Sequence, residues 1–207
     1  MLYKRYGPQG WWPGDSKLEC ILGAVLTQNT SWTNAEKAIL NLKKENIVGI
    51  KKLASVSTQA LASLIRPSGY YNQKAIKIKR VLSFVTENYG GSLKRMFDEE
   101  TRELRSKLLT INGIGPETAD TILLYAGHKP VFVIDTYTYR VLSRHGLVPE
   151  YTTYEEIQEL FTDTIPEDTA VYNEYHALLV RVGKEYCRKR SPACDGCPLQ
   201  YDPHTIL

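Results

Sequence analysis

The feature that most constrains this chain is a helical hydrophobic pattern that continues through most of its length. Apolar side chains recur every three or four residues in one segment after another, which is the spacing of the buried face of a helix. Capping boxes, in which Ser or Thr is followed three residues later by Glu, begin helices at Ser16–Glu19, Thr33–Glu36 and Thr153–Glu156. The pattern predicts an all-α fold.

A single run is typical of a β-strand, and it has no partner strand. This run is Val-Phe-Val-Ile at residues 131–134. We therefore expect it to form an extended, buried connector between helices. A helix is expected before it from Pro116 to Ala126, and the last long helix from Tyr172 to Val182.

Composition and charge exclude some classes of protein and leave others open. The chain has 207 residues, of which 43% are hydrophobic and 24% charged, so its composition is that of a globular domain and not of a disordered or collagen-like chain. Its net charge of +3 neither requires nor excludes a nucleic-acid partner. No apolar stretch reaches the ~18 residues of a membrane-spanning helix, and residues 1–12 lack the apolar core of a signal peptide. We expect a cytoplasmic protein with no membrane partner.

The most informative stretch is residues 108–120, where two helical patterns are joined by a tight turn. Gly113 and Gly115 flank Ile114 in this turn, and Pro116 occupies the first position of the next helix, where its missing N–H costs nothing. Glycines let the backbone approach a ligand closely, and free N–H groups at the helix start can hold a phosphate oxygen. Ile114 is expected to anchor the turn in the core. Taken alone, such a turn is also typical of an ordinary helix–helix connection.

A carboxylate follows the hairpin. About twenty residues after the turn, the apolar run 131–134 ends in Asp135, ahead of another helix. With these two motifs the sequence resembles the endonuclease III superfamily, the helix-hairpin-helix DNA glycosylases, over roughly residues 11–197. The resemblance implies that Asp135 is the catalytic carboxylate. An aspartate just before a helix is also a typical N-cap, and one side chain can serve both roles.

The resemblance implies a repair chemistry that suits a carboxylate. Cleavage of the bond between a base and its sugar builds oxocarbenium-like positive charge on the sugar, which a fixed carboxylate stabilises while it orients or deprotonates water. The base must first be flipped out of the duplex. The implied partner is double-stranded DNA with a damaged base. We expect the protein to be a monomer and to be associated with the nucleoid because it binds DNA. The residues that the resemblance places against DNA are Gln28, Gly113, Ile114, Gly115, Glu117, Thr118, Lys184, Arg188 and Lys189.

Glu117 distinguishes between two versions of this chemistry. Superfamily members that also cut the strand carry a lysine two residues after the second glycine of the hairpin, and its amine forms a Schiff base with the sugar. Here this position is Glu117, and a carboxylate cannot form an imine. We therefore predict a monofunctional glycosylase with water as the nucleophile. A bifunctional glycosylase/AP lyase is one alternative, and a non-catalytic DNA-binding module, which would need neither Asp135 nor an aromatic pocket, is a second.

All three tryptophans of the chain lie in two stretches near its N-terminus. Trp11 and Trp12 are adjacent, and Trp32 follows Gln28 by four residues. These stretches look like those of the 3-methyladenine DNA glycosylase branch, in which aromatic side chains at the matching positions sandwich the flipped base and the residue at Gln28 fills the gap in the duplex. An alkylated purine carries positive charge, which aromatic faces attract. The implied substrate is an alkylated purine such as 3-methyladenine, with uracil or mismatched thymine as the alternative.

Three of the four cysteines lie within eleven residues near the C-terminus. In a reducing compartment such a group is more typical of metal or cluster ligation than of disulfides. Cys187, Cys194 and Cys197 match three ligands of the superfamily's [4Fe–4S] loop, but the fourth position is Pro203, followed by His204. The alternatives are a cluster held by three cysteines and His204, a labile three-cysteine site, a lost cluster, and a zinc site with the same four ligands. We expect the [4Fe–4S] cluster.

The chain is expected to form two helical lobes with the DNA and the active site in a cleft between them. Residues 33–129 make one lobe and carry the hairpin at 112–116. Residues 1–32 and 130–207 make the second lobe, which ends in the cysteine-rich loop. Asp135 would then lie where the two lobes join.

Overall fold

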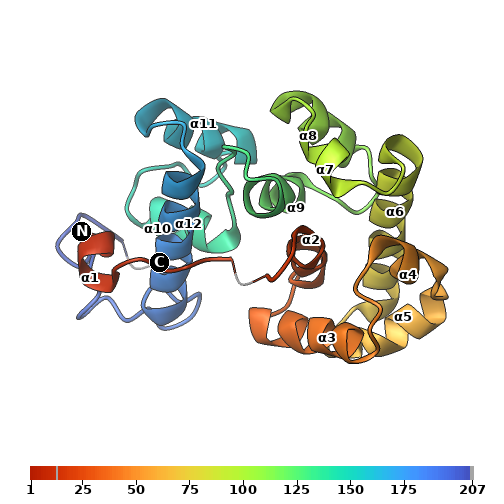
Figure 1. Cartoon of the computed structure of the whole chain (residues 1–207). Helices are drawn as coiled ribbons and strands as arrows, with labels where there is room; N and C mark the ends of the chain where they lie inside the picture. Colours follow the sequence, from red (N-terminus) through yellow and green to blue (C-terminus); the bar gives the residue numbers. More distant parts are fainter. Residues whose placement is uncertain (13, 206–207) are drawn as a thin grey trace. The chain divides into compact units, whose positions relative to one another are not determined.

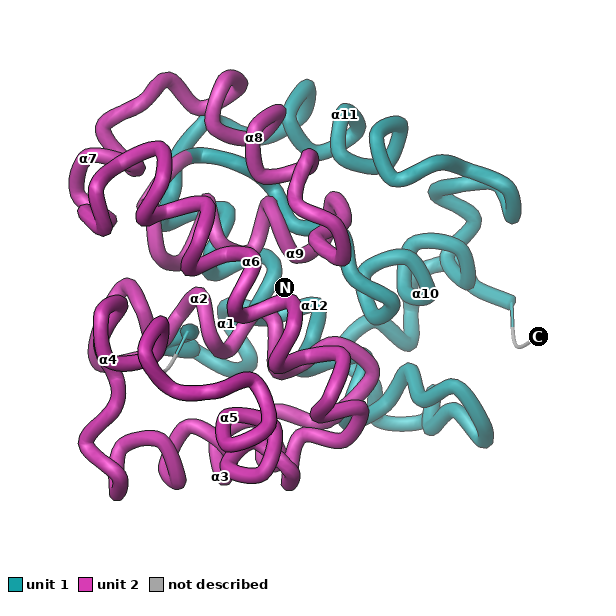
Figure 2. The backbone as a smooth tube through the Cα atoms, turned by 90° about the vertical axis from the view of Figure 1, so that its right-hand side faces the viewer, with its two compact units in different colours: residues 1–12, 130–207 teal, residues 13–129 magenta. Residues whose placement is uncertain are grey.

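The computed structural model describes residues 1–12 and 14–205, and its regular secondary structure is helical throughout (Figure 1). These residues contain no β-strand, which confirms the predicted all-α class. The chain divides into two compact units (Figure 2): unit 1, residues 1–12 and 130–207, and unit 2, residues 13–129. No helix in the described part of the chain is long and apolar enough to cross a bilayer.

Unit 2 is built around a helix that is buried along almost its whole length. Its elements are α2 (Lys17–Leu26), α3 (Trp32–Lys44), α4 (Ile50–Ser55), α5 (Thr58–Leu64), η1 (Arg66–Ser68), α6 (Tyr71–Tyr89), α7 (Leu93–Phe97), α8 (Thr101–Leu109), α9 (Pro116–Thr121) and η2 (Ile122–Ala126). The helix α2 buries every residue after its first and packs against α3, α6, α9 and η2. Residues 13–32, which the sequence analysis assigned to the other lobe, therefore lie with the hairpin in unit 2.

The helix predicted from Pro116 to Ala126 is present but changes character within that span. Its first part, α9, is α-helical, whereas η2 is a turn of π-helix in which the Gly127 N–H donates to the Ile122 carbonyl at 3.0 Å. A side chain at Gly127 has no room, because its Cβ would lie 2.7 Å from the carbonyl oxygen of Leu123. The helix thus ends at the residue where the sequence predicted its end.

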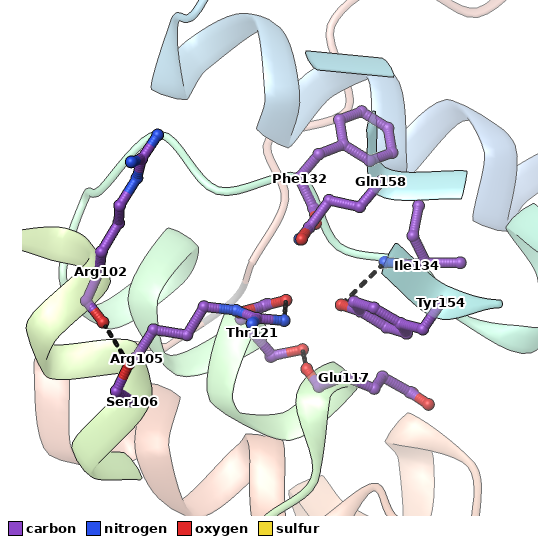
Figure 3. A network of polar contacts seen from close by, with 10 residues as sticks. Arg102, Arg105, Ser106, Glu117, Thr121, Phe132, Ile134, Tyr154 and Gln158 are labelled. Carbon is purple, nitrogen blue, oxygen red and sulfur yellow. Dashed lines mark hydrogen bonds and ion pairs between the residues drawn. The ribbon is translucent and has the colours of Figure 1, made fainter. Parts of the chain in front are cut away.

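The two helices of the hairpin are joined by an ion pair. The Arg105 guanidinium on α8 (Figure 3) donates two hydrogen bonds to the Asp120 carboxylate on α9, at 2.7 and 3.0 Å, and Asp120 is fully buried. Bidentate pairs of this kind fix orientation as well as distance. The turn at 112–116 therefore connects two helices whose relative position is also fixed by this ion pair.

Unit 1 contains α1 (Leu2–Tyr6), α10 (Thr136–Arg144), α11 (Tyr154–Thr164) and α12 (Thr169–Glu185). The helices α10 and α12 pack together extensively. Residues 131–134, which precede α10, form no regular element and all four are buried, as the sequence predicted. Unit 1 is thus a small helical bundle entered through a buried extended segment.

Side chains of α11 satisfy the backbone of this extended segment. The Gln158 side chain donates to the carbonyl of Phe132 at 2.6 Å, and the N–H of Ile134 donates to the Tyr154 hydroxyl at 3.3 Å (Figure 3). Buried backbone groups without a ladder partner need such bonds. The position of the residue that follows, Asp135, therefore depends on α11.

Candidate active site and hairpin

Asp135 ends the buried segment and caps α10. Its Oδ1 accepts a hydrogen bond from the Thr138 N–H at 2.7 Å, which is the N-cap arrangement expected from the sequence. Its Oδ2 lies 3.5 Å from Nε2 of His176, a buried residue of α12. The Asp135 side chain is 12% exposed, so the carboxylate that serves the fold still reaches the surface.

The surroundings of Asp135 favour the ionised carboxylate. Burial raises the pKa of Asp135, but the His176 imidazole 3.5 Å away and the Thr138 N–H lower it by more, so that the pKa lies below its ordinary value. A fixed anion with little access to water is well suited to stabilise a positive charge that develops beside it.

The segment that carries Trp11 and Trp12 is fastened to α12, the helix of His176. The Gln9 N–H donates to the Glu174 carboxylate at 2.9 Å, and the Arg181 guanidinium donates to the Gln9 side chain at 3.1 Å. These bonds join residues more than 160 positions apart in the sequence. Unit 1 therefore brings the tryptophan pair onto the helix that also faces Asp135.

The two tryptophans present aromatic faces beside a lysine. Their rings meet edge to face with centroids 5.8 Å apart, and both residues are half-buried. The Lys184 ammonium lies 5.2 Å from the Trp11 ring centroid, a cation–π distance. The contact shows that the Trp11 face is accessible to a cation, and Lys184 would have to leave this face before a positively charged base could stack there.

Gln28 contacts the hairpin of unit 2 directly. Its side-chain amide donates to the Gly113 carbonyl at 3.2 Å and to the Thr118 hydroxyl at 2.8 Å, while its oxygen accepts from the Lys77 ammonium at 2.5 Å. These bonds attach the turn to the residue that follows α2 by two positions and, through Lys77, to α6. Insertion of Gln28 into DNA stays a prediction, and it requires these bonds to break.

The two glycines of the hairpin are needed for different reasons. Gly113 has a φ of +96°, and a Cβ there would lie 2.8 Å from the Lys77 side chain, so the fold itself excludes a larger residue. Gly115 has a negative φ of −96°, and a Cβ there would meet nothing within 4 Å. Ile114 between them is buried, as predicted. The surface over Gly115 is open to a ligand.

The remaining predicted residues of unit 2 lie at helix starts. Glu117 is exposed in the first turn of α9, where a negative charge suits the helix dipole. Its carbonyl accepts from the Thr121 hydroxyl at 2.6 Å (Figure 3). Trp32 begins α3 and is half-buried. No lysine occupies the position of Glu117 or either residue next to it.

The candidate cluster ligands gather in unit 1. Cys187, Cys194, Cys197 and His204 line one cavity, and none of the three thiols is in a disulfide. Nδ1 of His204 lies 2.7 Å from the Asp202 carbonyl oxygen, so Nε2 is the nitrogen that could bind a metal. Cysteine thiolates and imidazole nitrogens are donors that iron–sulfur clusters accept, so the chemistry of this donor set fits a [4Fe–4S] cluster. Among residues 1–12 and 14–205 no such set is placed to hold a single metal ion.

Two arginines of α10 fasten the cysteine loop. Arg144 donates to the Arg188 carbonyl at 2.8 Å and to the Cys187 sulfur at 3.4 Å. Arg140 donates to the Cys187 carbonyl at 2.6 Å and to that of Gly183 at 3.1 Å. Because α10 begins at Asp135, the loop and the candidate catalytic carboxylate are attached to opposite ends of one helix. Lys184, Arg188 and Lys189 are exposed at the end of α12 and in this loop.

Sequence reasoning missed several residues of the site. His176 lies in an apolar helical face and had no motif to mark it, and Lys77 lies far in the sequence from the hairpin that it contacts. Arg140 and Arg144 lie four residues apart on the helix after Asp135, and this spacing is the one signal that could have indicated a shared contact.

The comparison with known families decides the identity. The model of the HhH-GPD superfamily base excision DNA repair proteins matches residues 22–167, a span that contains the hairpin and Asp135. The chain belongs to this superfamily. It is a DNA glycosylase of base excision repair, which confirms the resemblance seen in the sequence.

Relatives of this HhH-GPD glycosylase cover nearly its whole length. A provisionally named DNA repair glycosylase of Methanocaldococcus jannaschii, MJ1434, is 47% identical over 97% of this chain and 91% of its own. Endonuclease III of Thermotoga maritima is 31% identical over 87% of this chain and 79% of its own. The crystal structure of the Helicobacter pylori 3-methyladenine DNA glycosylase MagIII, bound to 1,N6-ethenoadenine, is 35% identical with a TM-score of 0.76 and covers 89% of this chain and 92% of that one.

The hairpin glycines provide a matched pair of variants. Gly113→Ala is expected to lower the free energy of unfolding by about 1–3 kcal/mol, because the residue keeps a left-handed conformation and meets Lys77. Gly115→Ala is expected to cost less, about 1 kcal/mol, because φ is negative there and the space is open, so that only the weaker N-cap preference of alanine is lost. Urea unfolding of both variants measures this difference, and equal losses would contradict the assignment.

His176 is expected to set the pH range in which Asp135 is ionised. In His176→Phe the burial of Asp135 remains while its contact with the imidazole is lost, so the pKa of Asp135 rises and the acid limb of the base-release rate moves to higher pH. His176→Gln keeps a polar donor at this position and should lie between. An acid limb that is the same in all three proteins would show that His176 does not act on Asp135.

The cysteine loop is expected to bind an iron–sulfur cluster. Anaerobically purified protein should contain iron and acid-labile sulfide in equal amounts, with less of both in His204→Ala. Elemental analysis and visible absorption measure this. Stoichiometric zinc, or protein without either element, would overturn the cluster assignment.

Proposed function

We propose that this HhH-GPD glycosylase is monofunctional and removes an alkylated purine from double-stranded DNA. Asp135 is its catalytic carboxylate and water is its nucleophile. The observation that carries the proposal is the partly exposed carboxylate of Asp135, which is held by the Thr138 N–H and faces His176, in the same unit as the Trp11–Trp12 pair.

The reaction follows from the chemistry of a fixed carboxylate. As the bond between C1′ and the base nitrogen breaks, the base leaves with the electron pair and positive charge develops on the sugar. Asp135 stabilises this charge and orients a water molecule, whose oxygen bonds to C1′. His176 keeps Asp135 ionised throughout and does not contact the sugar itself.

DNA binding is assigned to the hairpin and to the basic end of unit 1. The open backbone over Gly115 suits the close approach of a phosphate, and Lys184, Arg188 and Lys189 add exposed positive charge. Gly115→Ala should therefore weaken duplex binding although it folds. A [4Fe–4S] cluster held by the three cysteines and His204 would keep the basic loop in its fold and would take no part in the reaction.

The absence of strand cleavage is argued from Glu117. A lyase of this superfamily needs an amine at that hairpin position to form an imine with the sugar, and Glu117 offers a carboxylate. Endonuclease III of Thermotoga maritima is among the relatives, so a glycosylase with lyase activity is the second candidate.

The substrate class is argued from the tryptophans and one relative. The half-buried rings of Trp11 and Trp12 offer aromatic faces to which a cationic purine is attracted once Lys184 turns away from Trp11. The H. pylori relative is a 3-methyladenine DNA glycosylase whose structure holds 1,N6-ethenoadenine. Trp32, from unit 2, is proposed as a further aromatic contact to the base.

The function is tested by base release from a panel of duplexes. The duplexes carry a methylated adenine, 1,N6-ethenoadenine, uracil, hypoxanthine or a thymine mismatch, and each is developed with and without alkali. We expect release of the alkylated adenines, with strand breaks only after alkali and no protein–DNA adduct on borohydride treatment.

Each part of the proposal has its own contradicting outcome. Release of uracil or mismatched thymine alone would refute the substrate class and leave Asp135 in place. Strand breaks without alkali, together with a borohydride-trapped adduct, would refute the monofunctional mechanism. Tight duplex binding without release of any base would leave only a DNA-binding role.

A further inference from the structure

We propose that unit 1 carries a docking groove for a partner protein that presents a basic amphipathic helix. The groove has a volume of about 850 Å³ and is lined by residues of unit 1 alone, chiefly from α10, α11 and α12, with α1 at one end. It contains none of the residues assigned above to base, sugar, DNA or cluster. The inference therefore does not rest on the proposed substrate or mechanism.

Exposed apolar side chains concentrate in this groove. The structure exposes eleven large hydrophobic side chains among the described residues, and six of them line it: Met1, Tyr3, Leu147, Leu160, Val171 and Tyr175. Single exposed apolar residues are normal on any protein, but a contiguous set is costly in water and typical of a surface that another molecule covers. The groove floor is apolar as well, since Leu178 and Phe161 are buried beneath it.

The shape of the groove favours a helix as its occupant. Val171, Tyr175 and Leu178 follow one another at spacings of four and three along α12, which makes a continuous ridge on that helix. Leu160 on α11 and Leu142 on α10 face the same space. Ridges of this kind pack against the grooves of another helix, and an apolar channel between helices is a known receptor for an amphipathic helix.

The charge of the side chains at the groove edge indicates the charge expected on the partner helix. Residues 150–174, which span α11 and the start of α12, contain eight acidic side chains and no Lys or Arg. Glu174 lines the groove, and the exposed Glu159 and Asp163 are the sequence neighbours of the lining residues Leu160 and Thr164. The α11 and α12 side of the groove is therefore acidic, whereas the exposed Lys4 and Arg5 follow Tyr3 at its α1 end. A helix whose apolar stripe is flanked by Lys and Arg complements the acidic side.

The test uses a synthetic peptide as the probe and the full chain as the receptor. The peptide is a labelled helix with Leu at spacings of three and four and Lys or Arg between them. One control peptide has Glu in place of every basic residue, and a second has the same composition in scrambled order. Fluorescence anisotropy should show binding of the first peptide that weakens with salt, and affinities at least ten-fold lower for both controls.

Matched variants of the protein locate the binding. Leu160→Glu should lower the peptide affinity at least ten-fold, whereas Leu40→Glu, which changes an exposed leucine of α3 in unit 2 (48% exposed against 38% for Leu160), should leave it unchanged. Leu147→Ser, at a more exposed position of the groove, provides a second and milder variant if Leu160→Glu fails to fold. Base release and the thermal midpoint should not change in Leu147→Ser.

Three results would overturn the inference. Equal binding of the scrambled peptide would show attraction by charge alone, and unchanged binding to both groove variants would move the site elsewhere. Concentration-dependent dimers in sedimentation that disappear in Leu160→Glu would show that a second copy of this chain fills the groove.

Discussion

The structure depends above all on the two oxygens of one carboxylate. Oδ1 of Asp135 caps α10 through the Thr138 N–H, and Oδ2 faces the buried imidazole of His176. The first contact fixes the side chain, and the second lowers the pKa that burial raises. The same residue therefore begins a structural helix and is prepared for chemistry.

The rest of unit 1 holds that carboxylate in place. Tyr154 and Gln158 bind the extended backbone before it, and α12 supplies His176 together with the contacts that fasten the segment of Trp11. In unit 2 the hairpin is held in a similar way. The Arg105–Asp120 ion pair joins its two helices, and the Gln28 side chain hydrogen-bonds to its turn. Each unit thus positions its functional side chains with contacts that also stabilise its own fold.

Local patterns in the sequence were enough to predict much of this arrangement. The helical repeat gave the all-α class, the apolar run 131–134 gave the buried connector, and the position of Asp135 gave its N-cap role, because each of these depends on neighbours within a few residues. The burial of Ile114 followed from its place between two glycines. The hairpin and Asp135 together also indicated a DNA glycosylase, which the family comparison supports. The monofunctional mechanism indicated by Glu117 stays a prediction.

What escaped prediction depends on contacts between distant parts of the chain. His176 meets Asp135 across 41 positions, and the Gln9–Glu174 bond spans 165. Residues 13–32 belong with the hairpin because the buried helix α2 packs there, and an apolar run does not reveal which neighbour will cover it. Short helices such as α4 and α7 have too few turns to show a periodic pattern.

The most direct test of the account is a single-turnover comparison of wild-type protein and Asp135→Asn on a duplex with a methylated adenine. Asparagine keeps an oxygen for the Thr138 N–H, so the fold and duplex binding should be retained. Without the negative charge, base release should fall by a factor of about 10²–10⁴. Base release at the wild-type rate by a folded, DNA-bound Asp135→Asn protein would contradict the central role of this carboxylate.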